Sequence, residues 1–472
     1  MIEYRKCSIR FSDSFSLQSL NWRIAPGDTW AIVGPNGSGK SALAASLLSQ
    51  GKVLSGRRKL VPEQTAILSL EEQGRLIERE KIRDDSDITD KVNPGTPVRE
   101  MLDEVCVDRS LQDRLVHVLG LESLLERGFR KLSTGETRKV LFIRTLASSP
   151  SVIVLDEPFE GLDAQTVARV RDILSEMAGH ASMVLAVNRF DDIPDFITHI
   201  LRLDAGAISE QFACQDSDEA RRVLSQISQI RSDHSQLPEA EEQMALSLNE
   251  DGSLVRLRQG RVAYTDNLVF ENLNWQIYPG EHWRVKGPNG SGKTCLLNLV
   301  TGDHPQCYIN DLSLFGFKRG EGETIWDIKR YIGYVSTALH WDYRLSVNVT
   351  NVIVSGFHDS IGLYSKATGK QMAIAEQWLL LLGLNDKAGD SFASLSYGEQ
   401  RILLIARAMV KHPALLLLDE PCMGLDEANR ALVLSLIDRI CESGPTTLVY
   451  VSHHEEDKIA AIERELDLSQ EN

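Results

Sequence analysis

The strongest constraint on the fold of this chain is an internal repeat. An octapeptide, Gly-Pro-Asn-Gly-Ser-Gly-Lys followed by Ser or Thr, occupies residues 34–41 and again residues 287–294, an offset of 253 residues. The same offset aligns Asn21-Trp22 with Asn274-Trp275. Solenoid repeats have periods of about 20–50 residues, so a period this long indicates a duplicated domain. The length of 472 residues agrees with duplication, because it is too great for one ordinary core.

The repeat divides the chain into two copies and a connector. We expect the first copy over residues 1–210, the connector over residues 211–253 and the second copy over residues 254–472. Within the connector, residues 216–231 are predicted to be helical. The part that follows is acidic, rich in Gln and Glu and interrupted by Pro238. We therefore expect a helical and acidic linker rather than a third domain.

Composition argues against several classes of protein. No apolar run approaches the roughly 18 residues of a membrane-spanning helix, and the first residues lack an apolar signal core. The seven cysteines include no C-x-x-C pair, which argues against a disulfide framework and a zinc or cluster site. The net charge of −16 repels phosphate backbones unless a local basic patch compensates, so a nucleic-acid partner is not expected. We expect a cytoplasmic protein.

Both octapeptides match the phosphate-binding loop G-x-x-x-x-G-K-[S/T]. Glycines let backbone N–H groups approach phosphates closely, and the helix that follows presents its positive end to them. A glycine-rich turn without a ligand is the alternative, which the duplication disfavours. Lys40 and Lys293 are expected to reach the β- and γ-phosphates, and Ser41 and Thr294 to bind Mg²⁺. The full set predicted to hold nucleotide is Gly34, Pro35, Asn36, Gly37, Ser38, Gly39, Lys40, Ser41, Gly287, Pro288, Asn289, Gly290, Ser291, Gly292, Lys293 and Thr294.

Two apolar stretches end in paired carboxylates. Val-Ile-Val-Leu leads into Asp156-Glu157, and Leu-Leu-Leu-Leu leads into Asp419-Glu420. A buried parallel strand has this composition, and chemistry is expected at its C-terminal end. We predict that Asp156 and Asp419 hold Mg²⁺ through water. Glu157 and Glu420 are predicted to polarise the attacking water, as general base or as positioning group.

A third repeated motif, Leu-Ser-x-Gly-Glu, lies between the phosphate loop and the paired carboxylates of each copy. Ser-x-x-Glu is the pattern of a capping box, which starts a helix and needs no ligand. The glycine removes side-chain bulk where a phosphate could meet the helix N-terminus, so the placement of the motif favours a nucleotide contact. The residues of the motif are Ser133, Gly135, Glu136, Ser396, Gly398 and Glu399.

These three motifs occur in one order in both copies, and Gly-Leu-Asp follows at residues 161–163 and 424–426. In this order the chain resembles the ATP-binding-cassette (ABC) superfamily over nearly its whole length. The resemblance implies an α/β fold with two tandem P-loop NTPase domains, each with a RecA-like core and a helical subdomain. It also implies that the halves pair head to tail. ATP and Mg²⁺ would then lie between the phosphate loop of one half and the Leu-Ser-x-Gly-Glu signature of the other.

The same resemblance implies roles for residues outside these motifs. Asp163 and Asp426, which end the Gly-Leu-Asp motifs, would take part in nucleotide binding. Phe11 and Tyr264, aligned by the offset of 253 residues, stand where such domains place an aromatic ring against adenine. An ordinary strand aromatic is the alternative interpretation of both.

The two copies differ at the position of a catalytic histidine. Superfamily members carry a histidine after the next strand, where it contacts the γ-phosphate and the water. His453 matches this position, whereas the first copy has Asn188, which can donate a hydrogen bond but never carries charge. We therefore predict that the site built on the second phosphate loop turns over. The site built on the first is predicted to bind ATP and hydrolyse it more slowly.

Other departures from the superfamily pattern concern coupling to a membrane partner. Members usually have a Gln after an apolar strand, which senses Mg²⁺ and transmits closure to membrane subunits. Thr337 stands there in the second copy, and Glu71 or Glu72 in the first, where Gln73 is slightly out of register. Attachment to ordinary membrane subunits is therefore in question. Separately, Arg284 and Lys286 place two cations in the strand before the second loop, where the sequence gives no reason for them.

Within the superfamily the chain resembles a subgroup of tandem ATPases linked to molybdate operons. The resemblance rests on residues 132–139, 187–191, 301–306 and 322–329. Three roles follow. The first is a soluble regulatory or mechanical ATPase with a cytosolic partner. The second is the energy module of a separately encoded molybdate-type transporter, peripheral at the inner face of the plasma membrane. The third is a ribosome-associated tandem ATPase, which the short acidic connector disfavours.

Overall fold

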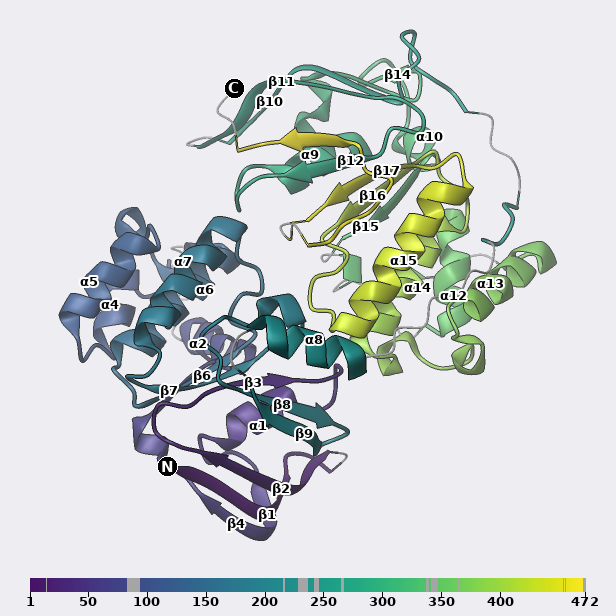
Figure 1. The fold of residues 1–472 in the computed structure, drawn as a ribbon. Coiled ribbons are helices and arrows are strands. Elements are labelled where there is room, and N and C mark those ends of the chain that lie inside the picture. Colours follow the sequence, from purple (N-terminus) through teal and green to yellow (C-terminus); the bar gives the residue numbers. More distant parts are fainter. Residues whose placement is uncertain are drawn as a thin grey trace. The chain divides into compact units, whose positions relative to one another are not determined.

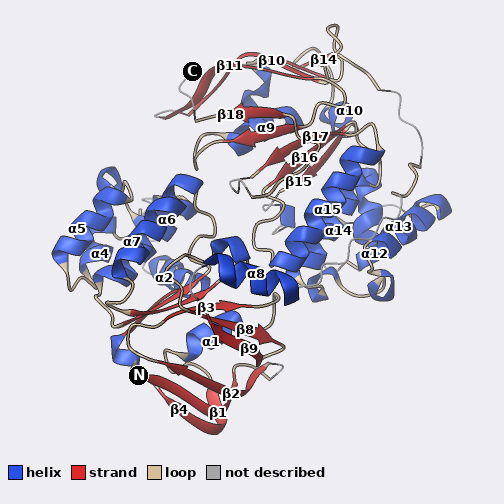
Figure 2. Cartoon of the chain, viewed as in Figure 1, coloured by secondary structure: helices blue, strands red, loops and turns tan. Residues whose placement is uncertain are grey.

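The computed structural model describes twelve stretches of the chain. They are residues 1–13, 15–82, 94–214, 217–227, 237–241, 246–264, 267–336, 339–340, 347–362, 366–452, 454 and 456–469. The chain divides into two compact units, Met1–Gln229 and Ile230–Asn472, and each contains one copy of the repeat. Sheets and helices occur together in both units (Figures 1 and 2), so the predicted α/β class is confirmed.

Two sheets organise the first unit. A three-stranded antiparallel sheet has the order β2-β1-β4, and a six-stranded sheet has the order β5-β6-β7-β3-β8-β9. In the larger sheet only β9 runs antiparallel to its neighbour. The strands are β1 Ile2–Arg10, β2 Ser16–Ile24, β3 Thr29–Val33, β4 Lys52–Lys59, β5 Thr65–Leu68, β6 Val152–Asp156, β7 Ser182–Ala186, β8 His199–Asp204 and β9 Ala207–Ala213.

The central strand β3 is apolar because both of its faces are buried. Alternate side chains point to opposite faces of a strand, and here Trp30 and Ile32 enter one core whereas Ala31 and Val33 enter another. The first core lies between the two sheets and includes helix α1. The second is formed with helices α4 to α7. The helices are α1 Lys40–Ser46, α2 Leu70–Ile82, α4 Val98–Asp103, α5 Arg109–Val118, α6 Thr134–Ala147, α7 Ala164–Met177 and α8 Ser217–Ile227, with short 3₁₀ turns η1 Pro62–Gln64, η2 Glu122–Leu124, η3 Phe129–Lys131 and η4 Phe190–Asp192.

The second unit repeats this plan. An antiparallel sheet has the order β11-β10-β13-β14, and a parallel sheet has the order β15-β16-β17-β12-β18. The strands are β10 Val255–Tyr264, β11 Asn267–Ile277, β12 Trp283–Lys286, β13 Asp311–Leu314, β14 Phe317–Lys318, β15 Ile332–Val335, β16 Leu415–Asp419, β17 Thr447–Val451 and β18 Arg464–Asp467. The helices are α9 Lys293–Thr301, α10 Ile325–Lys329, α12 Val349–Ser355, α13 Gly369–Leu381, α14 Tyr397–Met409 and α15 Glu427–Ser443, with 3₁₀ turns η5 Pro305–Tyr308, η6 Gly356–His358, η7 Asn385–Lys387 and η8 Phe392–Ser394.

Strand β18 accounts for the two unexpected cations of β12. The strands are parallel neighbours, and their register places Arg284 beside Glu465 and Lys286 beside Asp467. Lys286 Nζ lies 2.7 Å from Glu465 Oε2, and the Arg284 guanidinium donates to the carbonyl of His454. A charged strand therefore pairs with an acidic one. The partner could not be read from the sequence because β18 lies about 180 residues further along the chain.

The connector region is described only in part. Helix α8 falls within the predicted helical stretch and belongs to the first unit, where Arg221 donates to the carbonyls of Phe190 and Ile193. Over the residues that the structure describes, no helix combines the length and apolarity that crossing a bilayer would require.

Candidate functional site

Each phosphate loop joins a sheet strand to a helix, β3 to α1 in the first unit and β12 to α9 in the second. The first glycines have φ of +150° at Gly34 and +152° at Gly287. A Cβ on Gly34 would lie 2.2 Å from the carbonyl oxygen of Leu203, and one on Gly287 would lie 2.6 Å from Ser291 Oγ. Both positions therefore require glycine, and the tight turn leaves the loop backbone free of side-chain bulk.

The loop lysines lie inside their own loops. Lys40 Nζ donates to the carbonyls of Gly34 at 2.7 Å and Pro35 at 3.2 Å. Lys293 Nζ makes the equivalent bonds to Gly287 at 2.9 Å and Pro288 at 3.0 Å. Both side chains are buried, so each ammonium is held at the centre of its loop. This places a positive charge where a phosphate bound by the loop would lie.

A hydroxyl group meets a buried aspartate beside each loop. Thr294 Oγ1 donates to Asp419 Oδ2 at 3.1 Å, and the Ser41 side chain forms the corresponding bond with Asp156. Burial raises the pKa of both Asp156 and Asp419, although these hydrogen bonds and the loop lysines oppose the shift. Each pair combines a hydroxyl and a carboxylate oxygen, the donors that Mg²⁺ takes in phosphoryl-transfer sites.

The two glutamates that follow are held in an unusual backbone conformation. Glu157 and Glu420 each have φ of 51°, a left-handed value that costs free energy for a residue with a side chain. A hydrogen bond to the neighbouring strand end maintains it, from Glu157 N to Ala186 O at 2.9 Å and from Glu420 N to Val451 O at 3.0 Å. Burial, with the nearby carboxylates of Glu160 and Asp192, raises the pKa of Glu157 well above its ordinary value. A raised pKa suits a group that must accept a proton.

The structure adds an arginine behind each carboxylate pair, which the sequence reasoning missed. Arg138 is buried and donates to the backbone carbonyls of Asp156 and Glu157. Arg401, five residues after Ser396 as Arg138 is after Ser133, is fully buried, and its charge partly opposes the rise that burial causes in the pKa of Asp419. The repeat itself carried the signal, because the two arginines align when the signatures are superimposed.

Both signatures form complete capping boxes. Ser133 Oγ accepts from Glu136 N and the Glu136 side chain accepts from Ser133 N at 2.7 Å, at the start of α6. Ser396 and Glu399 repeat this arrangement at the start of α14. Both predicted capping boxes are therefore present in the structure. The backbone at each helix N-terminus remains the part of the signature that would contact a nucleotide. Gly398 packs against α15, where its added Cβ would lie 2.2 Å from Asn429 Cγ.

Asp163 and Asp426 are helix N-caps. Asp163 Oδ1 accepts from Thr166 N at 2.9 Å, and Asp426 Oδ1 accepts from Asn429 N at 2.9 Å. These bonds start α7 and α15 and need no nucleotide.

The two predicted adenine-stacking residues differ in environment. The ring of Phe11 packs on Gly51, where an added Cβ would lie 2.9 Å from its Cε2. Tyr264 is 55% exposed, and its hydroxyl lies 3.1 Å from His304 Nε2. Phe15 was not predicted, yet its ring lies against the first loop, because a Cβ on Gly39 would be 2.6 Å from Phe15 Cζ. Tyr264 therefore has the exposed face that a base would need.

The remaining predicted residues differ in whether and where the structure places them. His453 and Thr337 lie outside the described residues, so their roles stay predictions. Glu71 and Glu72 pair with Arg75 on the surface of α2, at 2.7 Å and 3.5 Å. Asn188 follows β7, at the same sheet edge as Glu157.

Buried polar atoms test whether these residues fit ATP and Mg²⁺. The buried polar atoms without a hydrogen-bond partner among the described residues include four in the candidate sites: Ser38 Oγ, Ser291 Oγ, Asp156 Oδ1 and Asn188 Oδ1. Each such atom costs about 1–3 kcal/mol. Phosphate oxygens would accept from the two serine hydroxyls, and metal-bound or attacking water would donate to the two oxygens of Asp156 and Asn188. The residues present therefore fit a nucleotide with a hydrated cation.

Comparison with known proteins gives a consistent result. The family model described as ABC transporter matches residues 17–160 and 270–423, one match in each unit. The chain is 43% identical over 467 residues to the ABC transporter ATP-binding protein ModF of Escherichia coli, covering 98% of this chain and 95% of the relative. It is 27% identical over 473 residues to an uncharacterized ABC transporter ATP-binding protein of Schizosaccharomyces pombe, covering 95% and 93%.

Solved structures agree on the fold. A structure titled RNase-L Inhibitor gives a TM-score of 0.64 at 20% identity, covering 98% of this chain and 87% of that chain. An archaeal ribosome recycling factor, solved in complex with an archaeal ribosomal stalk protein, gives 0.63 at 19% identity with the same coverage. At this identity the likeness concerns the fold alone.

Proposed function

The chain belongs to the ABC transporter family of ATP-binding proteins, and from this premise we propose that it is a tandem ATPase clamp with two ATP·Mg sites. Its ABC domains bind and hydrolyse ATP. The two sites, the clamp motion and the difference between the sites are the proposal. The observation that carries it is the duplicated set of lysine, hydroxyl–aspartate pair and glutamate at the ends of β3 and β6 and of β12 and β16.

Binding would begin at the loops. Lys40 and Lys293 exchange two carbonyl partners each for phosphate oxygens, so the charge is already in place and little reorganisation is needed. Ser41 with Asp156, and Thr294 with Asp419, would hold Mg²⁺, whose charge would offset that of the phosphates when bound. Glu157 and Glu420, fixed by their strand-end hydrogen bonds, would orient the attacking water and accept its proton.

The clamp follows from the tandem arrangement. Each half carries both a phosphate loop and a signature, and we propose that the signature of one half completes the site of the other. Ser396 and Gly398 would complete the first site, and Ser133 and Gly135 the second. ATP would then favour the closed arrangement because only there does each nucleotide contact both halves. Covalent fusion makes closure independent of protein concentration.

The two sites are proposed to work at different rates. Asn188 carries no charge at the position where the second half has His453, so it cannot supply the same electrostatic support to the reacting phosphate. Hydrolysis is therefore assigned mainly to the second site, on Lys293 and Glu420. The first site would hold ATP longer and keep the clamp assembled.

The matched pair Glu157→Gln and Glu420→Gln tests this assignment. Both changes keep the shape of the side chain and remove its ability to accept a proton. Steady-state ATPase activity should fall by at least tenfold in Glu420→Gln and by much less in Glu157→Gln. If Glu157→Gln abolished turnover while Glu420→Gln spared it, the assignment would be wrong.

Two physiological roles remain to be separated. A regulatory or mechanical ATPase with a cytosolic partner is our first proposal. The similarity to ModF, whose name describes an ABC transporter ATP-binding protein, favours the energy module of a membrane transporter as the second. The double variant Glu157→Gln/Glu420→Gln should stay closed on ATP. Fractionation of lysates with ATP and Mg²⁺ then decides: pelleting with membranes favours the transporter role, and a soluble complex favours the cytosolic one.

A further inference from the structure

The outward face of the small antiparallel sheet in the first unit is strongly basic. Residues such as Tyr4, Cys7 and Ile9 of β1 point into the core, whereas Arg5 and Lys6 between them are exposed. We call the charged outward residues of this sheet the basic face. It consists of seven exposed cations and one carboxylate: Arg5, Lys6, Arg10, Arg23, Lys52, Arg57, Lys59 and Glu3.

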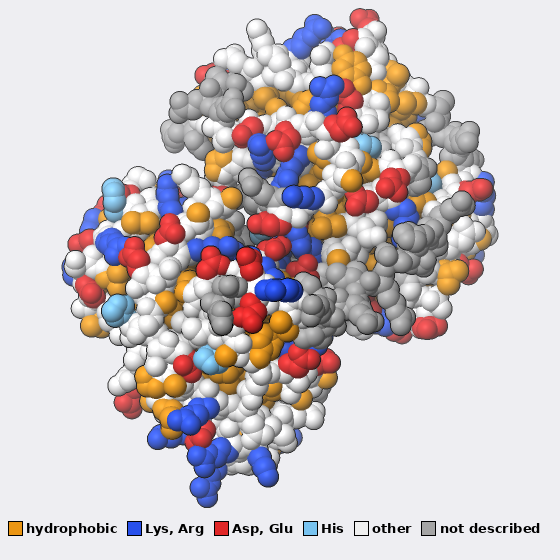
Figure 3. All heavy atoms as spheres, viewed as in Figure 1, with side chains coloured by type: hydrophobic (Ala, Val, Ile, Leu, Met, Phe, Trp, Pro, Cys, Tyr) orange, Lys and Arg blue, Asp and Glu red, His pale blue; other side chains and the backbone are white. Residues whose placement is uncertain are grey.

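This concentration of positive charge contrasts with the chain as a whole. Residues 1–60 contain nine Lys and Arg and three Asp and Glu, whereas the whole chain contains 51 and 67. Figure 3 shows Lys and Arg gathered at the end of the first unit that carries β1 and β4 in Figure 1. The net charge of −16 therefore conceals a local patch of the opposite sign.

The register of the strands brings like charges together. Arg5 stands directly opposite Arg57, and Arg10 directly opposite Lys52. Like charges directly opposite one another destabilise a sheet. Arg5 has an ion pair with Glu3 at 2.9 Å, but within the described part of the chain Arg23, Arg57 and Lys59 have none. Glu3, the one carboxylate of the face, stands opposite Arg23 and Lys59 and pairs with Arg5, so one negative charge is set against seven positive ones.

The second unit shows that the fold does not require this repulsion. Arg258, which the offset of 253 residues aligns with Arg5, stands opposite Asp311. Arg256 lies 3.6 Å from Asp251, and Arg261 lies 3.8 Å from Glu271. The same sheet in the duplicated domain therefore balances its cations. Of the two antiparallel sheets, as far as the structure describes them, only the one in the first unit carries positive charge that facing carboxylates do not balance.

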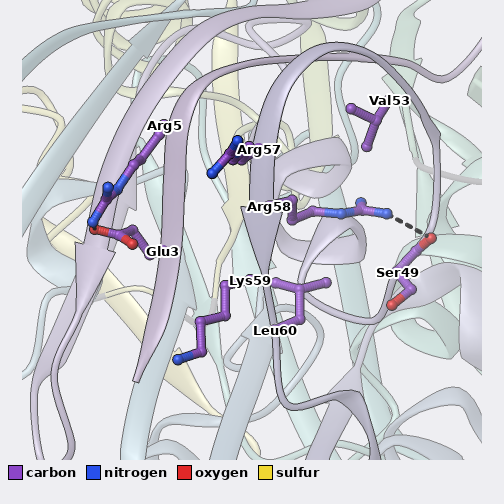
Figure 4. Close-up of a pocket in the computed structure, with 8 residues that line it drawn as sticks. All are labelled: Glu3, Arg5, Ser49, Val53, Arg57, Arg58, Lys59 and Leu60. Carbon is purple, nitrogen blue, oxygen red and sulfur yellow. Dashed lines mark hydrogen bonds and ion pairs between the residues drawn. The ribbon is translucent and has the colours of Figure 1, made fainter.

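One arginine of this region has a structural role and must be set apart. Arg58 donates to the carbonyls of Ser46, Ser49 and Gln50, which follow or end helix α1. A hollow of about 770 Å³ lies beside it, lined by Glu3, Arg5, Arg57 and Lys59 among others. In Figure 4 Arg58 reaches Ser49, whereas Arg57 and Lys59 extend away from it. These two side chains are available to a ligand.

We propose that the basic face binds the phosphodiester backbone of a nucleic acid. Four of the seven cations are arginines, and a guanidinium forms two parallel hydrogen bonds with a phosphate. Small polar residues, Ser19, Asn21 and Ser55, are exposed between the cations, and such side chains also contact phosphate and sugar. The aromatic residues Tyr4 and Trp22 point inward, so the face suits the backbone rather than stacked bases.

An anionic membrane is the competing surface, and the sheet fits it less well. Stable attachment to a bilayer needs an apolar anchor as well as basic charge. The exposed apolar residues of this region are Met1, Val53 and Leu54. Val53 stands opposite the inward-facing Ile9, which leaves Met1 and Leu54 as the two apolar side chains beside seven cations. The proposal also goes beyond the ATPase, because none of the cations of the basic face belongs to the proposed nucleotide sites.

Fluorescence anisotropy with labelled 24-base-pair duplexes, one of RNA and one of DNA, tests the proposal on the full chain. The variant Arg5→Gln/Arg57→Gln/Lys59→Gln removes three cations of the basic face and leaves Arg58 in place. The matched control Arg258→Gln/Arg261→Gln/Lys318→Gln removes three cations from the equivalent sheet of the second unit. Both change the net charge equally, so only a local effect separates them.

We expect the wild type to bind at least one duplex, with affinity that falls steeply as salt rises. The basic-face variant should bind at least tenfold more weakly, and its salt slope should be smaller by up to about 2.7, since each phosphate contact contributes about 0.9. The control should bind as the wild type does, and all three proteins should hydrolyse ATP alike. Absent duplex binding, equal weakening by both variants, or binding to vesicles with 30% phosphatidylglycerol but to neither duplex would each overturn the proposal.

Discussion

Replacing Gly398 by alanine sets two effects of opposite sign against each other. Gly398 lies near the start of helix α14, and alanine normally stabilises a helix by about 0.5–1 kcal/mol relative to glycine. The added Cβ, however, would lie 2.2 Å from Asn429 Cγ, and under 3.0 Å one of the two groups must move. Asn429 is not free to move without cost, because its Nδ2 donates to Asp426 Oδ1 at 2.9 Å.

The size of the loss follows from these contacts. Overpacking of this kind costs about 1–3 kcal/mol, and the lost hydrogen bond of Asn429 forms part of that cost. After the gain in helix propensity, the free energy of unfolding of the second unit should fall by up to about 2.5 kcal/mol. For a unit of this size, that is a fall in Tm of up to roughly 10 °C.

Differential scanning fluorimetry on three proteins checks the reasoning. Gly398→Ala should lower the Tm of the second unit. Gly74→Ala is the matched control, because Gly74 is also helical and a Cβ there would meet nothing within 4 Å, so it should not lower the Tm of the first unit. Gly398→Ala/Asn429→Ala should recover most of the loss. A rise in Tm for Gly398→Ala alone would refute the contact between the signature and α15.

Three further predictions address the loops, the aspartates and the pair between β12 and β18. Lys40→Met and Lys293→Met should each weaken nucleotide binding at one site by roughly ten- to hundredfold in a fluorescent-ATP titration, because a charge-assisted bond contributes about 1.5–3 kcal/mol; unchanged affinity would contradict the role of the lysines. Burial raises the pKa of Asp419, so the folded state binds the extra proton and gains stability as the pH falls through that raised value. Asp419→Asn should therefore have the higher Tm at pH 7 without nucleotide, and the difference should shrink on acidification; a difference independent of pH would count against the shift. Glu465→Gln should lower stability by less than about 1 kcal/mol in a thermal scan, since its ion pair with Lys286 is exposed, and a loss above 3 kcal/mol would show that β18 depends on it.

Features that are local in the sequence could be predicted. The tandem ABC resemblance and the α/β fold were confirmed by the comparisons and the structure. The sequence of each signature predicted a capping box and a candidate nucleotide contact. The structure contains the two capping boxes. Local motifs are readable because their spacing alone decides which backbone groups meet.

Features that depend on strand register or distant packing could not be predicted. Arg284 and Lys286 were unexplained until β18 was seen beside them. Arg5 faces Arg57 only because β4 pairs with β1 at one register, so a net charge averaged over the chain hid the basic face. The close approach of Gly398 to Asn429 likewise joins residues more than thirty positions apart. Each case needs tertiary structure, which composition and spacing do not contain.

The central claim is that each half provides a nucleotide site, and counting bound ATP tests it most directly. Equilibrium dialysis of Glu157→Gln/Glu420→Gln with radiolabelled ATP and Mg²⁺ measures the number of nucleotides per chain without loss to hydrolysis. The account predicts two, falling to one when Lys40→Met or Lys293→Met is added. A stoichiometry of one before either lysine is changed would contradict it.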